Sequence, residues 1–157
     1  MADLQSLFLR MAALEKEALA SLTVTADAVA FFFHQQERYP YFTNRLGQIE
    51  VDADSEELDL YQVEVIGRLI IGQVTDGIVR GENEARLQVY IPTVIQWVNE
   101  RELAQSVAYP TALDNLVRVR VTACRGYTEF AAGSTAQIGT EFTFVAEFEE
   151  PIEQAYL

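Results

Sequence analysis

The sequence has little of several residues on which common functions depend. Its 157 residues include one cysteine (Cys124), one histidine (His34) and one lysine (Lys16). A single cysteine excludes a disulfide within the chain, which fits a reducing compartment. No apolar run approaches about 18 residues, so we predict no membrane-spanning helix. The first residues contain no basic segment followed by an apolar run, so we also predict no secretory signal.

Catalytic and metal-binding signatures are equally scarce. His34 follows an aromatic run, and there is no second histidine that could activate Cys124. No Gly-x-Ser-x-Gly motif marks a serine nucleophile, and the spacing of the 24 acidic residues selects no acid–base pair. No metal-ligand spacing is present. We therefore predict that the protein is not an enzyme, that it has no catalytic, cofactor-binding or metal-binding residues, and that it needs no cofactor.

Two stretches begin like ligand-binding loops but lack the residues that would bind. The acidic run 52–59 has carboxylates at alternate positions, as a calcium loop does. However, Glu57 stands where that loop needs glycine, and Val63 stands where it needs glutamate. Gln73–Gly81 holds two glycines but lacks the Gly-Lys-Ser/Thr ending of a phosphate loop. We interpret the first as a solvated acidic turn and the second as a loop without a ligand.

What the sequence has in excess is negative charge. The formal net charge is −13, and such a surface repels phosphate. This argues against tight binding of nucleic acid, although DNA could pass close by without binding. Ten of the eleven basic residues are arginine. Arginine suits fixed pairs with carboxylates, so we expect ion pairs within the fold or at an interface.

The most regular pattern runs from Ile138 to Glu149 and predicts a half-buried strand, because apolar and polar side chains alternate with a period of two. Pro151 should close this strand, because it cannot donate a backbone hydrogen bond. The side chains predicted to be buried are Ile138, Phe142, Phe144, Ala146 and Phe148. The side chains predicted to face away are Glu141, Thr143, Glu147 and Glu149.

The same alternation predicts two further long strands and two short ones. The long strands are Tyr61–Ile71 and Val117–Ala123. We expect Gly67 to mark a bulge in the first of them. The short strands are Val29–Phe33 and Gln48–Val51, and an ordered loop, Tyr39-Pro40-Tyr41-Phe42, should lead into the second short strand.

The last two long strands are predicted to pair antiparallel. Gly126–Gln137 is rich in small and polar residues, which indicates a short, flexible connection between them. Paired in this way, the strands would bring Arg118 and Arg120 toward Glu141 and Glu147.

Two helices are predicted from apolar residues at three- and four-residue spacing. The first spans Leu4–Leu22, with Asp3 as its N-cap and the β-branched run Thr23-Val24-Thr25 as its end. The second has Asn83 as its cap. Because Pro92 lies inside it, we expect a kink or two shorter helices. The stripe of the second helix is predicted to be Leu87, Ile91, Val94, Ile95 and Val98, and it can extend to Leu103.

Together these elements predict one domain over residues 1–157 with an α+β fold. Its two layers are a mixed or antiparallel sheet and helices packed on one face of that sheet.

The order of elements resembles the tail-terminator proteins of long-tailed bacteriophages. The resemblance rests on the N-terminal helix and on Tyr39-Pro40-Tyr41-Phe42 leading into a strand. It also rests on the long strand Leu60–Ile71 after an acidic stretch, and on a kinked helix within Glu82–Val107 after a glycine-containing loop. The closing hairpin, whose last strand reads Gly139-Thr140-Glu141-Phe142-Thr143-Phe144, completes it.

This resemblance implies a homomeric ring, commonly a hexamer, that stops growth of the tail tube and offers a surface to the head-side connector. The implied partners are further copies of the chain, the tail tube protein and the connector or neck protein. DNA would pass without specific binding, and no membrane would be involved. The implied location is the tail–neck region of the virion, and the host cytoplasm during assembly. Two other functions stay open: a neck or head-closure connector protein, and a small acidic enzyme or ligand-binding domain.

Overall fold

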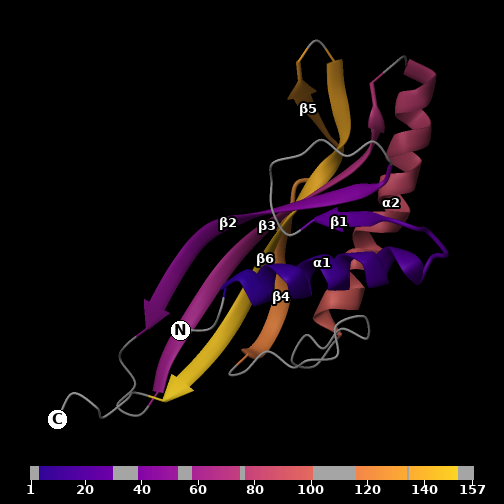
Figure 1. Cartoon of the computed structure of the whole chain (residues 1–157). Coiled ribbons are helices and arrows are strands. Elements are labelled where there is room, and N and C mark those ends of the chain that lie inside the picture. Colours follow the sequence, from indigo (N-terminus) through magenta and orange to yellow (C-terminus); the bar gives the residue numbers. More distant parts are fainter. Residues whose placement is uncertain are drawn as a thin grey trace.

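The computed structural model describes residues 4–29, 39–52, 58–74, 77–100, 116–133 and 135–151. In this part of the chain, helices and strands follow one another as drawn in Figure 1. In chain order they are α1 (Leu4–Ala20), β1 (Asp27–Val29), β2 (Tyr41–Asp52), β3 (Leu58–Gln73), α2 (Gly77–Asn99), β4 (Leu116–Cys124), β5 (Thr128–Ala132) and β6 (Thr135–Pro151).

The strands form one mixed sheet. Its order is β1-β2-β3-β6-β4, and β5 pairs with the first part of β6. β1 and β2 are parallel, whereas every other pair is antiparallel. The predicted antiparallel pairing of the last two long strands is confirmed by β4 and β6. β3 and β6 form the longest pair, from Leu58 opposite Pro151 to Gln73 opposite Gln137.

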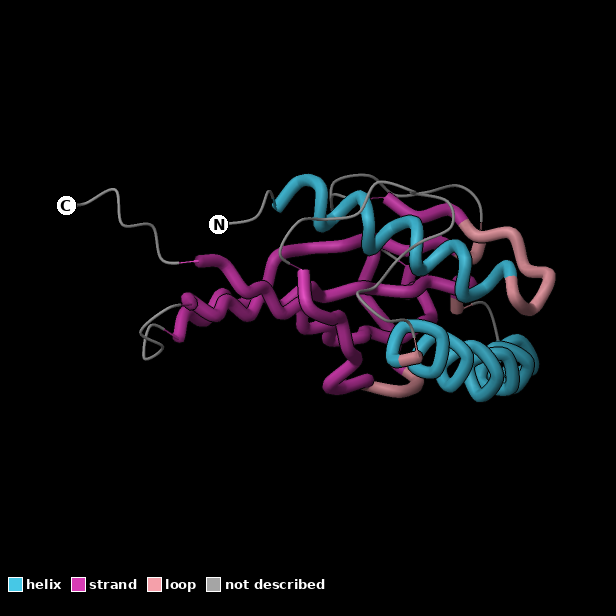
Figure 2. Tube along the Cα trace, turned by 90° about the horizontal axis from the view of Figure 1, so that it is seen from below, coloured by secondary structure: helices cyan, strands magenta, loops and turns pink. Residues whose placement is uncertain are grey.

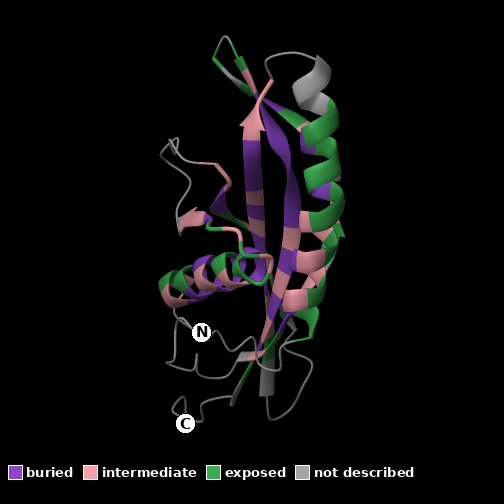
Figure 3. Ribbon diagram, turned by 90° about the vertical axis from the view of Figure 1, so that its right-hand side faces the viewer, coloured by how far each residue is buried: buried purple, intermediate pink, exposed green. Residues whose placement is uncertain are grey.

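Both helices pack on the same face of this sheet, which we call the covered face. One cluster of buried side chains joins α1 and α2 to β2, β3, β4 and β6. In Figure 2 α2 is seen nearly end-on while α1 runs across the view, so the helices cross at a wide angle. Figure 3 shows buried residues along the central strands and exposed residues along the outer side of α2. The predicted α+β fold, with helices on one face, is confirmed.

The alternation that predicted the C-terminal strand places its side chains correctly. On β6 the five apolar positions are buried against the helices, and Pro151 is the last residue of the strand. Burial of each phenylalanine stabilises the fold by roughly 1.5–3 kcal/mol before side-chain entropy is subtracted. The five buried positions are Ile138, Phe142, Phe144, Ala146 and Phe148.

Gly67 does not mark a bulge. The register of β3 runs through Gly67 without a shift, and the shifts fall after Leu46 in β2 and after Ile70 in β3. A Cβ atom at position 67 would lie 2.6 Å from Oε2 of Glu15 and 2.6 Å from the ring of Phe144. Glycine is needed here because two side chains close over the strand, not because the strand bends.

β2 is longer than predicted and begins at Tyr41. The expected loop Tyr39–Phe42 is therefore wrong for its last two residues. Tyr41 is buried on the uncovered face of the sheet and Phe42 is buried in the core, so the pair follows the alternation of a strand. Of the predicted strand Val29–Phe33 only Val29 is described, as the end of β1. The remaining residues and His34 lie outside the described part.

The first helix agrees with its prediction. α1 ends at Ala20, and Thr23 then takes a positive φ of 61° at the start of the predicted β-branched terminator. The predicted cap Asp3 lies outside the described residues, as do residues 53–57 of the acidic run.

The second helix departs from its prediction at its beginning. α2 starts at Gly77, inside the predicted loop Gln73–Gly81. Asn83 is therefore not a cap. Its buried side chain lies over Gly72 of β3, where a Cβ atom would be 3.3 Å from Asn83 Nδ2. Pro92 lies within one continuous helix, so of the two alternatives predicted at this proline, a kink or two shorter helices, the second is wrong.

The connection Gly126–Gln137 is not a flexible loop, because it contains β5. Thr128–Ala132 pairs with β6 through a turn at Gly133, whose φ is 66°. Phe130 of β5 packs with Tyr41 and Ile70 in a small second cluster, which fixes β5 against the sheet. This cluster lies on the uncovered face, opposite the helices.

Candidate functional site: the open face of the sheet

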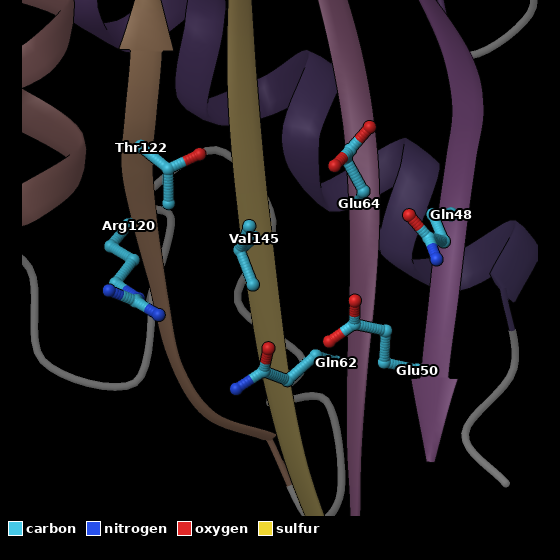
Figure 4. A pocket seen from close by; sticks show the side chains of 7 residues that line it. All are labelled: Gln48, Glu50, Gln62, Glu64, Arg120, Thr122 and Val145. Carbon is cyan, nitrogen blue, oxygen red and sulfur yellow. The ribbon is translucent and has the colours of Figure 1, made fainter.

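The face of the sheet opposite the helices, which we call the open face, carries most of the charged side chains that the strands position. They come from alternate residues of β2, β3, β4 and β6, because side chains on a strand alternate between the two faces. Figure 4 looks onto part of this face, with α1 behind the strands. The arginines and glutamates that form ion pairs on this face fall into two groups.

The first group, the Glu141 cluster, has Arg45, Arg68 and Arg125 around one carboxylate. Arg68 donates from Nε at 3.0 Å and from an Nη atom at 2.8 Å to Oε2 of Glu141. Arg125 donates to Oε1 at 3.3 Å, and Arg45 lies 3.8 Å from Oε2. Burial alone would raise the pKa of Glu141, but the contacts with Arg68, then Arg125 and Arg45, outweigh it and hold this pKa below its ordinary value.

Aromatic packing fixes the Glu141 cluster in place. The guanidinium carbon of Arg68 lies 4.0 Å above the centre of the Phe130 ring, so β5 covers the arginine that binds Glu141. Tyr41 packs beside Phe130 in the same small cluster. Burial raises the pKa of Tyr41, and a hydrogen bond with Gln137 partly offsets that shift.

The second group, the Glu147 cluster, has Arg118 and Arg120 around one carboxylate. Arg118 donates to Oε2 and Oε1 of Glu147 at 2.7 and 3.2 Å, and Arg120 lies 3.4 Å from Oε1. The hydrogen bonds to Glu147 raise the pKa of Arg118. The predicted contacts of these arginines with Glu147 are confirmed. Those with Glu141 are wrong, because Arg118 stands opposite Glu147 and Arg120 opposite Val145.

A shallow hollow of about 220 Å³ lies beside the Glu147 cluster. Val145 on β6 forms its floor, because this short side chain stands between Arg120 on β4 and Glu64 on β3 (Figure 4). Its full lining is Gln48, Glu50, Gln62, Glu64, Arg120, Thr122 and Val145. Polar side chains of both charges around a small apolar floor make a surface suited to contact with another protein.

The two sides of the open face differ in charge. On β4 and just after it, Arg118, Arg120 and Arg125 form what we call the arginine flank; 56% of Arg118 and 60% of Arg125 are exposed. On β2 and β3, Glu50 and Glu64 form the carboxylate flank. Within the described part of the chain, neither Glu50 nor Glu64 has an ion pair.

A second polar group, which the sequence analysis missed, is buried under α1. Glu15 is fully buried, and its Oε1 accepts a hydrogen bond of 2.6 Å from Asn44 Nδ2 on β2. Burial raises the pKa of Glu15 well above its ordinary value, and the hydrogen bond from Asn44 offsets this only in part. The signal was available: Glu15 follows Met11 by four residues and precedes Ala18 by three, so it falls on the buried stripe.

Other chemistry is sparse in the described residues. No three side chains of His, Cys, Asp or Glu gather there as metal ligands would. Cys124 is only half-buried, and its Sγ lies 3.2 Å from Oγ1 of Thr140. No helix among these residues is long and apolar enough to cross a membrane.

Comparison with models of known protein families gives no match for this sequence, and comparison with curated proteins gives none either.

Proposed function

We propose that this chain is a non-enzymatic structural protein of a bacteriophage virion. In this proposal several copies form a ring, six in the family that the sequence resembles, which terminates the tail tube and joins the tail to the head-side connector. The protein would lie in the tail–neck region of the virion, and in the host cytoplasm during assembly. Its partners would be further copies of itself, the tail tube protein and the connector.

The observation that carries the proposal is the open face of the sheet. In the described part of the chain both helices lie on one side of the long strands, and the other side carries exposed ion pairs with a surplus of arginine at one flank and of carboxylate at the other. An uncovered sheet face with side chains of both charges around a small apolar floor offers a surface for contact with another protein. The order of elements that underlies the resemblance supports the same function.

The charge of the C-terminal part fits a ring through which DNA passes. Residues 126–157 contain six glutamates and neither lysine nor arginine. Arginines of other elements pair with Glu141 and Glu147, whereas Glu129 and Glu149 are exposed. A negative lumen repels the phosphate backbone, so genomic DNA would move through the ring without binding to its wall.

The test uses the tail tube protein of the same phage. Tubes assembled with this chain present should stop growing and should carry a ring of density at one end in negative-stain images. Tubes assembled without it should continue to lengthen. If tubes grow normally and stay uncapped while the chain binds the portal-side connector, the protein is a neck component and the terminator proposal is wrong.

A further inference from the structure

The charge of the chain limits which of its surfaces can meet in an assembly. Each copy has a formal net charge of −13, so two copies that meet at randomly chosen surfaces repel each other. A contact between copies therefore needs a surface where arginine is in surplus. The arginine flank is such a surface, because Arg118 and Arg120 share the single carboxylate of Glu147.

The strand register places these arginines at the ends of two cross-strand rows. The first row crosses four strands. Glu147 on β6 pairs with Arg118 on β4 at one side and with Gln62 on β3 at the other. Gln62 in turn pairs with Glu50 on β2. The row therefore begins with a cation at one side of the sheet and ends with an anion at the other.

The neighbouring row repeats this polarity. Arg120 on β4 stands opposite Val145, which stands opposite Glu64 on β3. Both rows run in the same sense, from arginine to glutamate, so the two flanks have opposite charge along the same stretch of the sheet.

The two flanks share the open face but lie toward different edges of the sheet. β4 is one edge of the sheet. At the other side, β1 pairs with β2 only from Tyr41 to Thr43, so no described strand covers the outer edge of β2 from Arg45 to Asp52. A closed ring of identical subunits requires two different patches on each copy, and the two flanks, toward the β4 edge and the β2 edge of the open face, are such patches.

We propose that the arginine flank of one copy contacts the carboxylate flank of the next, with Arg118 and Arg120 beside Glu50 and Glu64 of its neighbour. Each charged row then continues from copy to copy around the ring. This inference rests on the proposed ring, and it identifies the two surfaces that form the seam.

The contact is made by side chains rather than by pairing of edge strands. On β4 the backbone N–H of Val121 already donates to Oδ1 of Asn99 at 2.8 Å, so α2 blocks that edge. On β2 a bulge follows Leu46, which disturbs the edge further.

Charge reversal at the two flanks tests this seam. Arg118→Glu and Glu50→Arg are made as separate proteins. Both positions are exposed, so each variant should keep the fold, although Arg118→Glu loses its pair with Glu147 and should melt at a somewhat lower temperature; circular dichroism and melting temperature check this. Self-association is measured by sedimentation equilibrium over a series of protein concentrations. Each single variant should associate more weakly, by on the order of tenfold in dissociation constant, because like charges then meet at the seam.

Mixing the two variants gives the decisive result. In an equimolar mixture, the glutamate introduced at position 118 of one protein would meet the arginine introduced at position 50 of the other. At the next seam the unaltered residues Arg118 and Glu50 would meet, so alternating assemblies should recover the association lost by each variant alone. Arg86→Glu and Glu84→Arg, at exposed positions on α2, are the matched controls and should leave association unchanged. Association of the single variants equal to that of the unaltered chain, or no recovery in the mixture, overturns the seam.

A cysteine trap covers the case in which free copies associate too weakly to sediment together. In a Cys124→Ser background, Arg118→Cys and Glu50→Cys are combined in one chain. Within a chain the two positions are three strand spacings apart, about 14 Å, which is too far for a disulfide. Oxidation should give a ladder of linked copies. The pair Arg86→Cys with Glu50→Cys should give none beyond chance dimers.

Failure of the seam and failure of the proposed function give different results. If the unaltered chain caps tail tubes but both flank variants cap them equally well and the trap gives no ladder, the ring proposal stands and the seam is wrong. If the ladder forms but tubes are never capped, the seam is right and the terminator proposal is wrong.

Discussion

The covered and open faces of the sheet are built from the same strands, yet they are held together by different forces. On the covered face, alternate residues of β3 and β6 bury phenylalanine, valine and leucine against both helices. On the open face, the residues between them are held by ion pairs such as Arg68–Glu141 and Arg118–Glu147. Burial of apolar area is worth far more per residue than an exposed ion pair. The covered face should therefore determine stability, and the open face should be free to determine contacts.

Each face also contains a carboxyl group with a shifted pKa, and the two shifts have opposite signs. Glu15 is buried under α1, where burial raises its pKa. Glu141 lies on the open face, where three arginines overcome the effect of burial and lower its pKa. The two faces should therefore respond to pH with opposite signs.

The largest effect is expected on the covered face from Phe144→Ala. Phe144 is fully buried and stacks on Phe142, with ring centroids 5.8 Å apart. Its removal should lower the free energy of unfolding by about 3–5 kcal/mol, because apolar burial is lost and a cavity remains. Urea unfolding monitored by circular dichroism measures this change. A loss below about 1 kcal/mol would show that the covered face does not dominate stability.

A smaller loss is expected from Gly67→Ala, which adds one methyl group under α1. The new Cβ would collide with Glu15 Oε2 and with the Phe144 ring, each at 2.6 Å, and should cost about 1–3 kcal/mol in the same unfolding experiment. Gly81→Ala is the matched control. Position 81 lies in α2 with open space around it, so the added methyl should instead stabilise by roughly 0.5–1 kcal/mol. Equal effects at the two positions would contradict the close approach at Gly67.

Glu15→Gln should stabilise the protein at neutral pH. In the folded chain Glu15 keeps its proton to a higher pH than in the unfolded chain, so stability falls as pH rises from the ordinary value of 4.5 through the raised folded pKa. Glutamine cannot ionise but can still accept the hydrogen bond from Asn44. We expect a gain on the order of 1 kcal/mol at pH 7, or roughly 2–4 °C in melting temperature.

The control for this prediction is Glu84→Gln at an exposed position of α2. Its melting temperature should follow that of the unaltered chain at every pH. A Glu15→Gln protein that melts lower than the unaltered chain at pH 7 would show that the buried carboxylate is stabilised by contacts that outweigh its burial.

The covered face could be predicted from the sequence because its signal is local. In β6, five apolar residues at every second position identify both the strand and its buried side, and the stripe of α1 is equally regular. β5 could not be predicted, because its residues are mostly small. The packing of Phe130 on Tyr41 and Ile70, which holds it, joins residues far apart in the sequence. The same holds for the early start of α2, where Asn83 lies against Gly72.

The open face was predictable only where partners lie on strands joined by a short connection. The contacts of Arg118 and Arg120 with Glu147 follow from the pairing of β4 with β6. The pair Arg68–Glu141 joins residues 73 positions apart and depends on the register of β3 against β6. A shift of one residue would move these side chains to the other face, and sequence alternation does not determine that register across a long separation.

The smallest effect is expected from Glu141→Gln on the open face, and its sign with pH should be opposite to that of Glu15→Gln. The folded-state pKa of Glu141 lies below its ordinary value of 4.5, so its charge stabilises the fold above that value. This contribution is lost as pH falls through the lowered folded pKa. At pH 7 the substitution should cost about 0.5–1 kcal/mol, because Arg45 and Arg125 are largely exposed and water screens them. The difference from the unaltered chain should shrink as the pH is lowered from 4.5 through the lowered folded pKa, because Glu141 itself then becomes neutral. Melting curves recorded from about pH 3 to pH 8 for both variants test the pair together.

If the Glu141→Gln difference stays constant or grows toward low pH, the three arginines do not hold this carboxylate in its charged form. The open face would then contribute its ion pairs to contacts with other molecules and not to the fold.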